Sequence, residues 1–139
     1  MRKIFSGRPA KPRFTPDDAA NTRLRDTVIF EAERGPNFAG HYRLVISTCG
    51  TGCSQTSIVD SVTGKLYRNM PFEMLVRTRL DGHIEPYSFQ LHSRLLVAQG
   101  YFDSEFPTDT SECSRRYYEW IGSSFKLRRK TLVKCAPPL

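Results

Sequence analysis

The sequence has no apolar run long enough to cross a membrane, so it predicts no transmembrane segment. Its first fourteen residues, MRKIFSGRPAKPRF, also lack the apolar core of a signal peptide, which taken literally indicates a cytosolic protein. Signatures of several enzyme classes are absent as well: there is no Walker A loop, no G-x-S-x-G elbow and no H-E-x-x-H helix. We therefore assign no catalytic residue, and we expect no cofactor and no metal.

Charge is distributed unevenly along the chain, which carries 21 Lys and Arg against 14 Asp and Glu and has a net charge of +7. The cations gather in residues 2–13 and 115–134, while the middle of the chain is close to neutral. Such a field favours anionic partners. Because no zinc-finger, RRM, KH or helix-turn-helix signature occurs, nucleic acid is a poor candidate. We expect a protein or an anionic envelope component as partner, and nothing in the sequence indicates the oligomeric state.

The length of 139 residues predicts a single domain. Residues 1–14 hold Pro9 and Pro12 among basic side chains, which favours an extended conformation over a helix. We expect this segment to form a basic extended arm, followed by one domain that spans residues 15–139.

Residues 15–34 carry the boundary signals of one helix. Thr15 suits the N-cap, Pro16 suits the first helical position, and Gly35 followed by a proline ends the helix. Apolar residues recur at helical spacing, so this helix should lie on an apolar surface. The stripe comprises Ala20, Leu24, Val28 and Ala32, widened by Ile29 and Phe30.

After the helix the apolar period changes to two, which predicts strands separated by tight turns. Short strands joined in this way indicate an antiparallel meander. We expect the α+β class, with the N-terminal helix packed on a curled antiparallel β-meander of about six or seven short strands. The strand candidates are residues 41–47, 55–61, 65–69, 87–92, 94–102, 115–121 and 124–133.

Four cysteines in a short chain suit an oxidising compartment. A disulfide between Cys49 and Cys53 requires a sharp reversal, and the glycines at 50 and 52 are free to take the positive φ values that this needs. Cys113 and Cys135 would then remain to pair. The conflict with the missing signal peptide disappears if the sequence begins after the leader of an exported protein.

Two alternatives use the same cysteines differently. All four could bind zinc in a nucleic-acid-binding protein, but Cys113 and Cys135 lie too far apart in sequence to form a second close pair. A hydrolase or thiol enzyme could use Cys49 or a histidine. His41 and Cys49 bracket one strand, about 26 Å apart if it is fully extended, so they are poorly placed to act together.

Three stretches between Gly35 and Tyr67, GPNFAGHYRLV, CGTGC and SIVDSVTGKLY, resemble a family of small exported bacterial proteins. The patterns in common are N-F-A-G-H-Y, C-G-x-x-C and I-V-D-x-x-T-G-K. Members usually carry a signal peptide or lipoprotein leader, so the resemblance implies a periplasmic or secreted protein whose leader is absent from this chain. It also implies an extracytoplasmic disulfide at the cysteine pair and a tight entry from helix to sheet at GPNFAGHY. It implies no activity.

Four residues are candidates for binding. Asn37 and His41 are polar side chains close to the stapled turn, where they could line a pocket or simply shape the chain. Tyr118 and Trp120 lie on a strand whose alternation does not distinguish a core position from an exposed contact. The sequence favours a non-catalytic extracytoplasmic binding module over an enzyme. Its closest concrete form is an immunity or inhibitor protein with an acidic partner.

Overall fold

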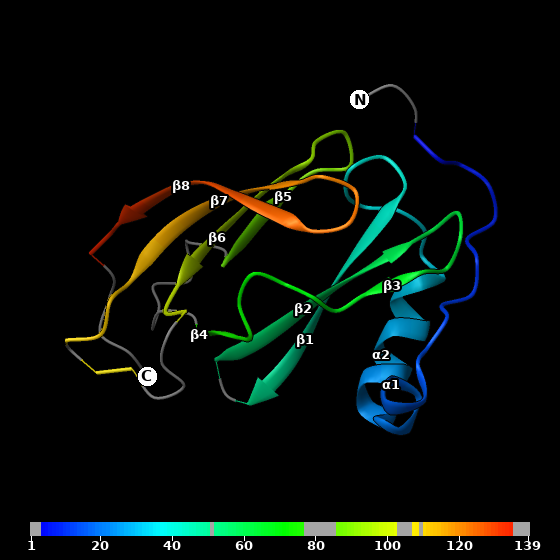
Figure 1. Cartoon of the computed structure of the whole chain (residues 1–139), viewed down its shortest axis with the longest axis horizontal. Helices are drawn as coiled ribbons and strands as arrows, with labels where there is room; N and C mark the ends of the chain where they lie inside the picture. The colour runs from blue at the N-terminus through cyan, green and yellow to red at the C-terminus, as the bar shows by residue number, and fades with distance from the viewer. Residues whose placement is uncertain (1–3, 51, 77–85, 103–106, 109, 135–139) are drawn as a thin grey trace. The chain divides into compact units, whose positions relative to one another are not determined.

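The computed structural model describes residues 4–50, 52–76, 86–102, 107–108 and 110–134 (Figure 1). The chain divides into two compact units. The first unit comprises Met1–Ser47, Thr56–Asn69 and Gln90–Arg94, and the second comprises Thr48–Gln55, Met70–Phe89 and Leu95–Leu139.

Two helices occupy the segment where the sequence predicts one. α1 covers Pro16–Ala20 and is capped by Thr15, as expected, whereas α2 covers Thr22–Ala32. Asn21 separates them because its backbone is extended and its side chain accepts a hydrogen bond from the backbone N–H of Leu24, 3.2 Å away. Asparagine competes well for such caps, so it starts a new helix instead of continuing the old one. No helix among the described residues is long and apolar enough to span a membrane.

α2 packs on the first unit through one narrow apolar stripe. Leu24, Val28 and Ala32 are buried in a cluster with Val45 and Val59 of the neighbouring strands. Their regular spacing places them on one side of the helix, so this part of the predicted stripe is confirmed.

The predicted widening of that stripe is wrong. Ile29 and Phe30 are 38% and 64% exposed, and Ala20 is exposed in the preceding helix. The two larger residues are neighbours of the buried Val28 in sequence, but at about 100° per residue they turn away from the core. They remain on the surface of the first unit.

The first sheet has four strands. β1 spans Tyr42–Gly50 and β2 spans Cys53–Asp60, and the two are neighbours. The two-residue strands β3, Leu66–Tyr67, and β4, Leu75–Val76, both pair antiparallel with β2.

The second sheet is an antiparallel meander in the order β5-β6-β7-β8 (Figure 1). Its core is largely aromatic: Phe72 contacts Phe102 and Tyr118, with ring centroids 5.0 and 5.8 Å apart. The strands are β5 Tyr87–Phe89, β6 Leu95–Gly100, β7 Ser114–Trp120 and β8 Phe125–Leu132.

The α+β class is therefore confirmed, and the single meander covered by one helix is wrong. β3 and β4 are only two residues long, and each pairs with part of β2. Beyond that, β4 makes, among the described residues, an isolated bridge between Val76 and Tyr101 and no longer ladder. The chain instead begins a second sheet at β5. Strand patterns identify the strands but not their partners, and β4 was not among the strand candidates.

The N-terminal segment is extended and, within the first unit, is hydrogen-bonded to the turn between β2 and β3. Backbone N–H groups of Ala10 and Arg13 donate to the carbonyls of Ser61 and Gly64, each across 2.8 Å. Gly64 has φ +81°, and a Cβ there would collide with the carbonyl of Lys11. The turn between β2 and β3 thus needs glycine so that the segment can approach closely.

Candidate functional site

The stretch GPNFAGHY forms the entry from α2 to β1, and Asn37 organises it. The Asn37 Oδ1 atom accepts a hydrogen bond from the Leu44 backbone N–H at 2.7 Å, and its Nδ2 donates to the Leu44 carbonyl at 3.3 Å. Phe38 and Tyr42 exchange two backbone hydrogen bonds of 3.0 Å beside it. The amide of Asn37, predicted as a binding residue, is engaged within the fold.

A second loop holds the tip of this turn. Ala39 and Gly40 have φ values of +51° and +88°, and Ala39 is the one non-glycine residue with positive φ in the described chain. Their backbone N–H groups donate to the carbonyls of Ser93 and Leu91, across 3.0 and 2.8 Å. These bonds compensate for a conformation that most side chains disfavour.

His41 leaves the turn and meets Asp60 at the end of β2. The His41 Nδ1 and Asp60 Oδ1 atoms are 3.1 Å apart, and the side chains are 37% and 10% exposed. The same carboxylate oxygen accepts a hydrogen bond from the Val62 backbone N–H at 2.9 Å. Asp60 was not among the site candidates, although it is the aspartate of the I-V-D-x-x-T-G-K pattern.

Aromatic side chains surround this pair. The His41 ring lies 4.1 Å from Tyr42, which contacts Tyr67 edge-on at 6.4 Å. The Lys65 Nζ atom sits 5.0 Å from the centre of the Tyr67 ring. Burial raises the pKa of the Tyr67 hydroxyl, and the Tyr42 and Asp60 groups raise it further. The carboxylate orients the imidazole, an arrangement that suits either a structural turn or proton transfer.

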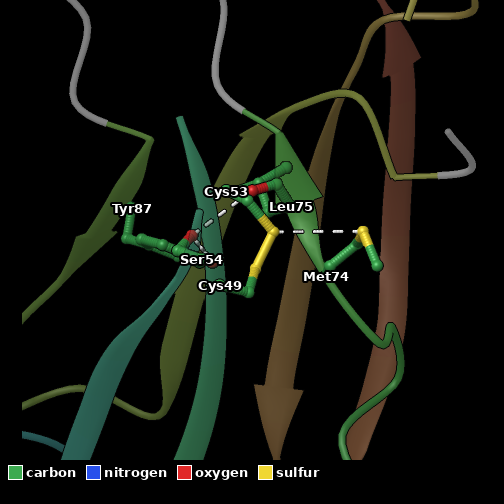
Figure 2. Close-up of a disulfide and its surroundings, with 6 residues drawn as sticks. All are labelled: Cys49, Cys53, Ser54, Met74, Leu75 and Tyr87. Atoms are coloured by element: carbon green, nitrogen blue, oxygen red, sulfur yellow. Dashed lines mark hydrogen bonds between the residues drawn. A yellow bond between two sulfur atoms is a disulfide. The ribbon is translucent and has the colours of Figure 1, made fainter. Parts of the chain in front are cut away.

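The predicted staple joins the ends of β1 and β2 (Figure 2). Cys49 and Cys53 form a disulfide across a Cα–Cα distance of 5.1 Å, within the normal range. Gly52 has φ +74°, as the sharp reversal requires. Figure 2 shows the thioether sulfur of Met74 beside the bridge, 4.0 Å from Cys53 Sγ.

A buried tyrosine secures the strand that carries the bridge. The hydroxyls of Ser54 and Tyr87 are 2.8 Å apart, and Ser54 also donates to the Leu75 carbonyl at 3.4 Å (Figure 2). Burial raises the pKa of Tyr87 to about 12, and its hydrogen bond to Ser54 opposes that rise only in part. These bonds tie the first residues of β2, beside the disulfide, to β4 and to Tyr87 of β5.

The oxidation state of the cysteines decides what they can do. In the disulfide, Cys49 and Cys53 have no thiolate for nucleophilic attack or zinc ligation. Cys113 is disulfide-bonded as well, and its predicted partner, Cys135, lies outside the described residues. Among the described residues, no group of three or more His, Cys, Asp or Glu side chains that could hold a metal occurs.

Cations gather on one face of the second sheet, formed by β7 and β8. Facing residues in neighbouring strands point to the same side, and the register pairs Tyr117 with Arg129 and Glu119 with Lys126. The opposite side carries the buried core. We call the outward side the cationic face, and it consists of Arg115, Tyr117, Glu119, Lys126, Arg128 and Arg129.

Specific contacts hold parts of the cationic face in place. The Arg115 Nε donates to Gln99 Oε1 at 2.7 Å, and the Arg128 Nε donates to Glu119 Oε1 at 2.9 Å. The Arg129 guanidinium lies 5.8 Å from the centre of the Tyr117 ring. Lys126, Arg128 and Arg129 are exposed. Four cations therefore share this surface with one carboxylate.

The remaining two binding candidates lie in the core of the second unit. Tyr118 and Trp120 are each 1% exposed, and both contact Phe125. A role for Tyr118 and Trp120 in partner contact stays a prediction, and neither ring is exposed for such a contact. Neighbouring Tyr117 points to the other side of β7, where strand alternation places it on the cationic face.

Comparison of the chain with models of protein families, with curated proteins and with solved structures returned no match. Membership of the family of small exported bacterial proteins therefore stays a proposal, based on the sequence motifs alone. Two of these motifs meet in the structure, since His41 of GPNFAGHY contacts Asp60 of SIVDSVTGKLY.

Proposed function

We propose that this protein is a non-catalytic extracytoplasmic binding module that recognises an anionic partner through its cationic face. The observation that carries the proposal is that Arg115, Lys126, Arg128 and Arg129 share one side of two paired strands with a single carboxylate, that of Glu119. An array of this kind accelerates the encounter with an anionic surface and fixes the register of the complex.

The rigidity of the face supports recognition. Its cations project from hydrogen-bonded strands, and two of them, Arg115 and Arg128, are already held by side-chain hydrogen bonds. Ordering before binding lowers the entropy lost on binding. Tyr117 adds a flat, amphipathic contact of the kind enriched at interfaces.

The disulfide supports the extracytoplasmic part of the proposal. Disulfides persist in oxidising compartments such as the periplasm and the extracellular space. The partner class is then an acidic protein or an anionic envelope component. An immunity or inhibitor protein is the most concrete version, because a small disulfide-bonded scaffold with a cationic face suits recognition of an acidic protein.

One observation favours the alternative of an enzyme that uses a histidine, namely the His41–Asp60 contact. We rank it second because Asp60 also bonds the backbone of its own turn, a structural task that accounts for the contact. Replacement of His41 by Ala separates the two readings: loss of stability without loss of any binding leaves only the structural role.

The binding proposal is tested with two anionic probes, inorganic polyphosphate and poly-glutamate, measured at several salt concentrations. The variant K126E/R129E reverses two charges of the cationic face. The matched control R23E/R94E makes the same change in net charge at two exposed positions of the first unit. We expect K126E/R129E to weaken binding of at least one probe roughly tenfold, and the control to weaken it much less.

Equal losses in the two variants would mean that net charge alone attracts the probes, and the face would lose its assigned role. Preference for poly-glutamate over polyphosphate would point to an acidic protein as partner, and the reverse preference to a phosphate-rich envelope component.

A further inference from the structure

An apolar groove of about 390 Å³ lies in the first unit, between the N-terminal segment and α2. Pro9, Pro12 and Phe14 line one wall, and Ile29 and Ala32 of α2 line the other. Ile29 is 38% exposed, so its side chain is accessible at the groove. The groove lies outside the cationic face and has a different chemistry.

Both walls are fixed by contacts that do not involve the groove itself. The backbone N–H groups of Ala10 and Arg13 donate to carbonyls of the turn between β2 and β3. Proline restricts the backbone of the same segment further. The opposite wall is held by burial of Leu24 and Val28 under α2. The groove is therefore formed before a ligand arrives, as in most small-molecule sites.

The size of the groove restricts what it can hold. Sites for small ligands span about 300–1,000 Å³, and this volume lies near the lower limit. A helix or a folded partner needs far more surface, since stable protein interfaces bury about 800 Å² on each side. A single flexible alkyl chain suits a site of this volume with mainly apolar walls.

The charged groups at the groove favour an anionic head group. Lys11 and Glu33 both line it, one from each wall, and both are exposed. Lys11 belongs to a basic stretch, because residues 4–14 contain three cations and no acid. Its ammonium group, on the N-terminal wall, would attract a carboxylate.

We propose that this groove binds a medium-chain fatty acid, with the alkyl chain against Phe14 and Ile29 and the carboxylate near Lys11. Burial of the alkyl chain away from water supplies most of the affinity. The site goes beyond the proposed function, because it lies in the other unit and takes its ligand mainly through apolar contacts.

The test is isothermal titration of the full chain with dodecanoate below its micellar concentration. The variant I29W places a larger side chain in the groove at a position that tolerates it, being partly exposed. The control F30W makes the same kind of change at the adjacent residue, which is 64% exposed and does not line the groove. We expect saturable binding of one dodecanoate, weakened at least tenfold by I29W and less than twofold by F30W.

A second pair of measurements tests the head group and the independence of the site. K11E should weaken dodecanoate severalfold and leave dodecyltrimethylammonium no weaker, whereas K126E/R129E should leave dodecanoate binding unchanged. Absence of saturable binding, or equal effects of I29W and F30W, would overturn the proposal. Self-association that I29W abolishes, without dodecanoate binding, would overturn it as well and assign the groove to a second copy of the chain.

Discussion

The carboxylate of Asp60 lies 3.1 Å from the imidazole of His41, and this contact joins two segments that are 19 residues apart in sequence. It is reinforced by the backbone, because the Ser61 N–H donates to the His41 carbonyl at 2.8 Å. The entry turn of β1 and the exit turn of β2 are therefore one structural unit. The motifs GPNFAGHY and SIVDSVTGKLY have a common physical role in holding it together.

Replacement of His41 by Ala should lower the free energy of unfolding by about 1 kcal/mol, the usual net value of one hydrogen bond. Asp60→Ala should cost more, since it also removes the acceptor of the Val62 N–H. Urea denaturation of both variants measures these costs. If H41A kept full stability, the contact would have no structural role and the enzymatic reading of His41 would gain weight.

Asn37→Ala should be more damaging than H41A. The two hydrogen bonds to Leu44 disappear together, and Leu44 is 1% exposed, so its backbone groups cannot turn to water. An unsatisfied buried group costs about 1–3 kcal/mol. Asn37→Asp keeps the acceptor and loses only the donor, so its thermal midpoint should fall between those of wild type and N37A. Equal midpoints for wild type and N37A would contradict this role.

The double variant C49S/C53S should unfold more easily than wild type. Closing a loop of this short length restricts the unfolded chain by an amount equivalent to about 2 kcal/mol. Reduction of the wild-type protein should lower its stability in denaturant titrations at least as much as the double substitution does, because Cys113 is disulfide-bonded too. The effect of reductant on C49S/C53S reports that second bridge alone. A double variant as stable as wild type would show that the staple is dispensable.

Stability should fall at high pH through Tyr87. Its pKa is raised from 10.0 to about 12 by burial, so the folded state keeps the proton that the unfolded chain releases. The contribution is complete below pH 10 and is lost as the pH rises toward 12, by about 1.4 kcal/mol per pH unit. Tyr87→Phe removes this titration. The difference in unfolding free energy between wild type and Y87F, measured by urea denaturation, should therefore shrink as the pH rises from 10 toward 12. If the unfolding free energies of the two proteins depended on pH in the same way, the assignment would be contradicted.

Local features were well predicted by the sequence. The N-cap at Thr15, the end of the helical segment before Gly35 and the pairing of Cys49 with Cys53 depend on neighbouring residues alone. So do seven of the eight strands seen in the described residues, whose alternation and turn residues are local signals. The missed strand, β4, has only two residues and no period to detect.

Features that depend on distant partners were not predicted. The division into two sheets depends on which strand pairs with β3 and β4. The helix break at Asn21 is a local feature that was also missed, because an asparagine can cap a new helix or continue an existing one. The alternation of side chains along β7 does not predict that Tyr118 faces the core and Tyr117 the surface. Both faces of this strand contain aromatic and basic residues, so neither face is recognisable as the buried one from the sequence. The cationic face itself appears only after the register of β7 and β8 is known.

Binding through the cationic face is the central claim, and amide chemical-shift mapping tests it most directly. Labelled protein would be titrated with inorganic polyphosphate at moderate salt, with K126E/R129E as the comparison. The account predicts that the largest shifts fall on Arg115, Tyr117 and Arg129 and disappear in the variant. Shifts concentrated on the N-terminal segment, or spread evenly over all exposed basic residues, would contradict it.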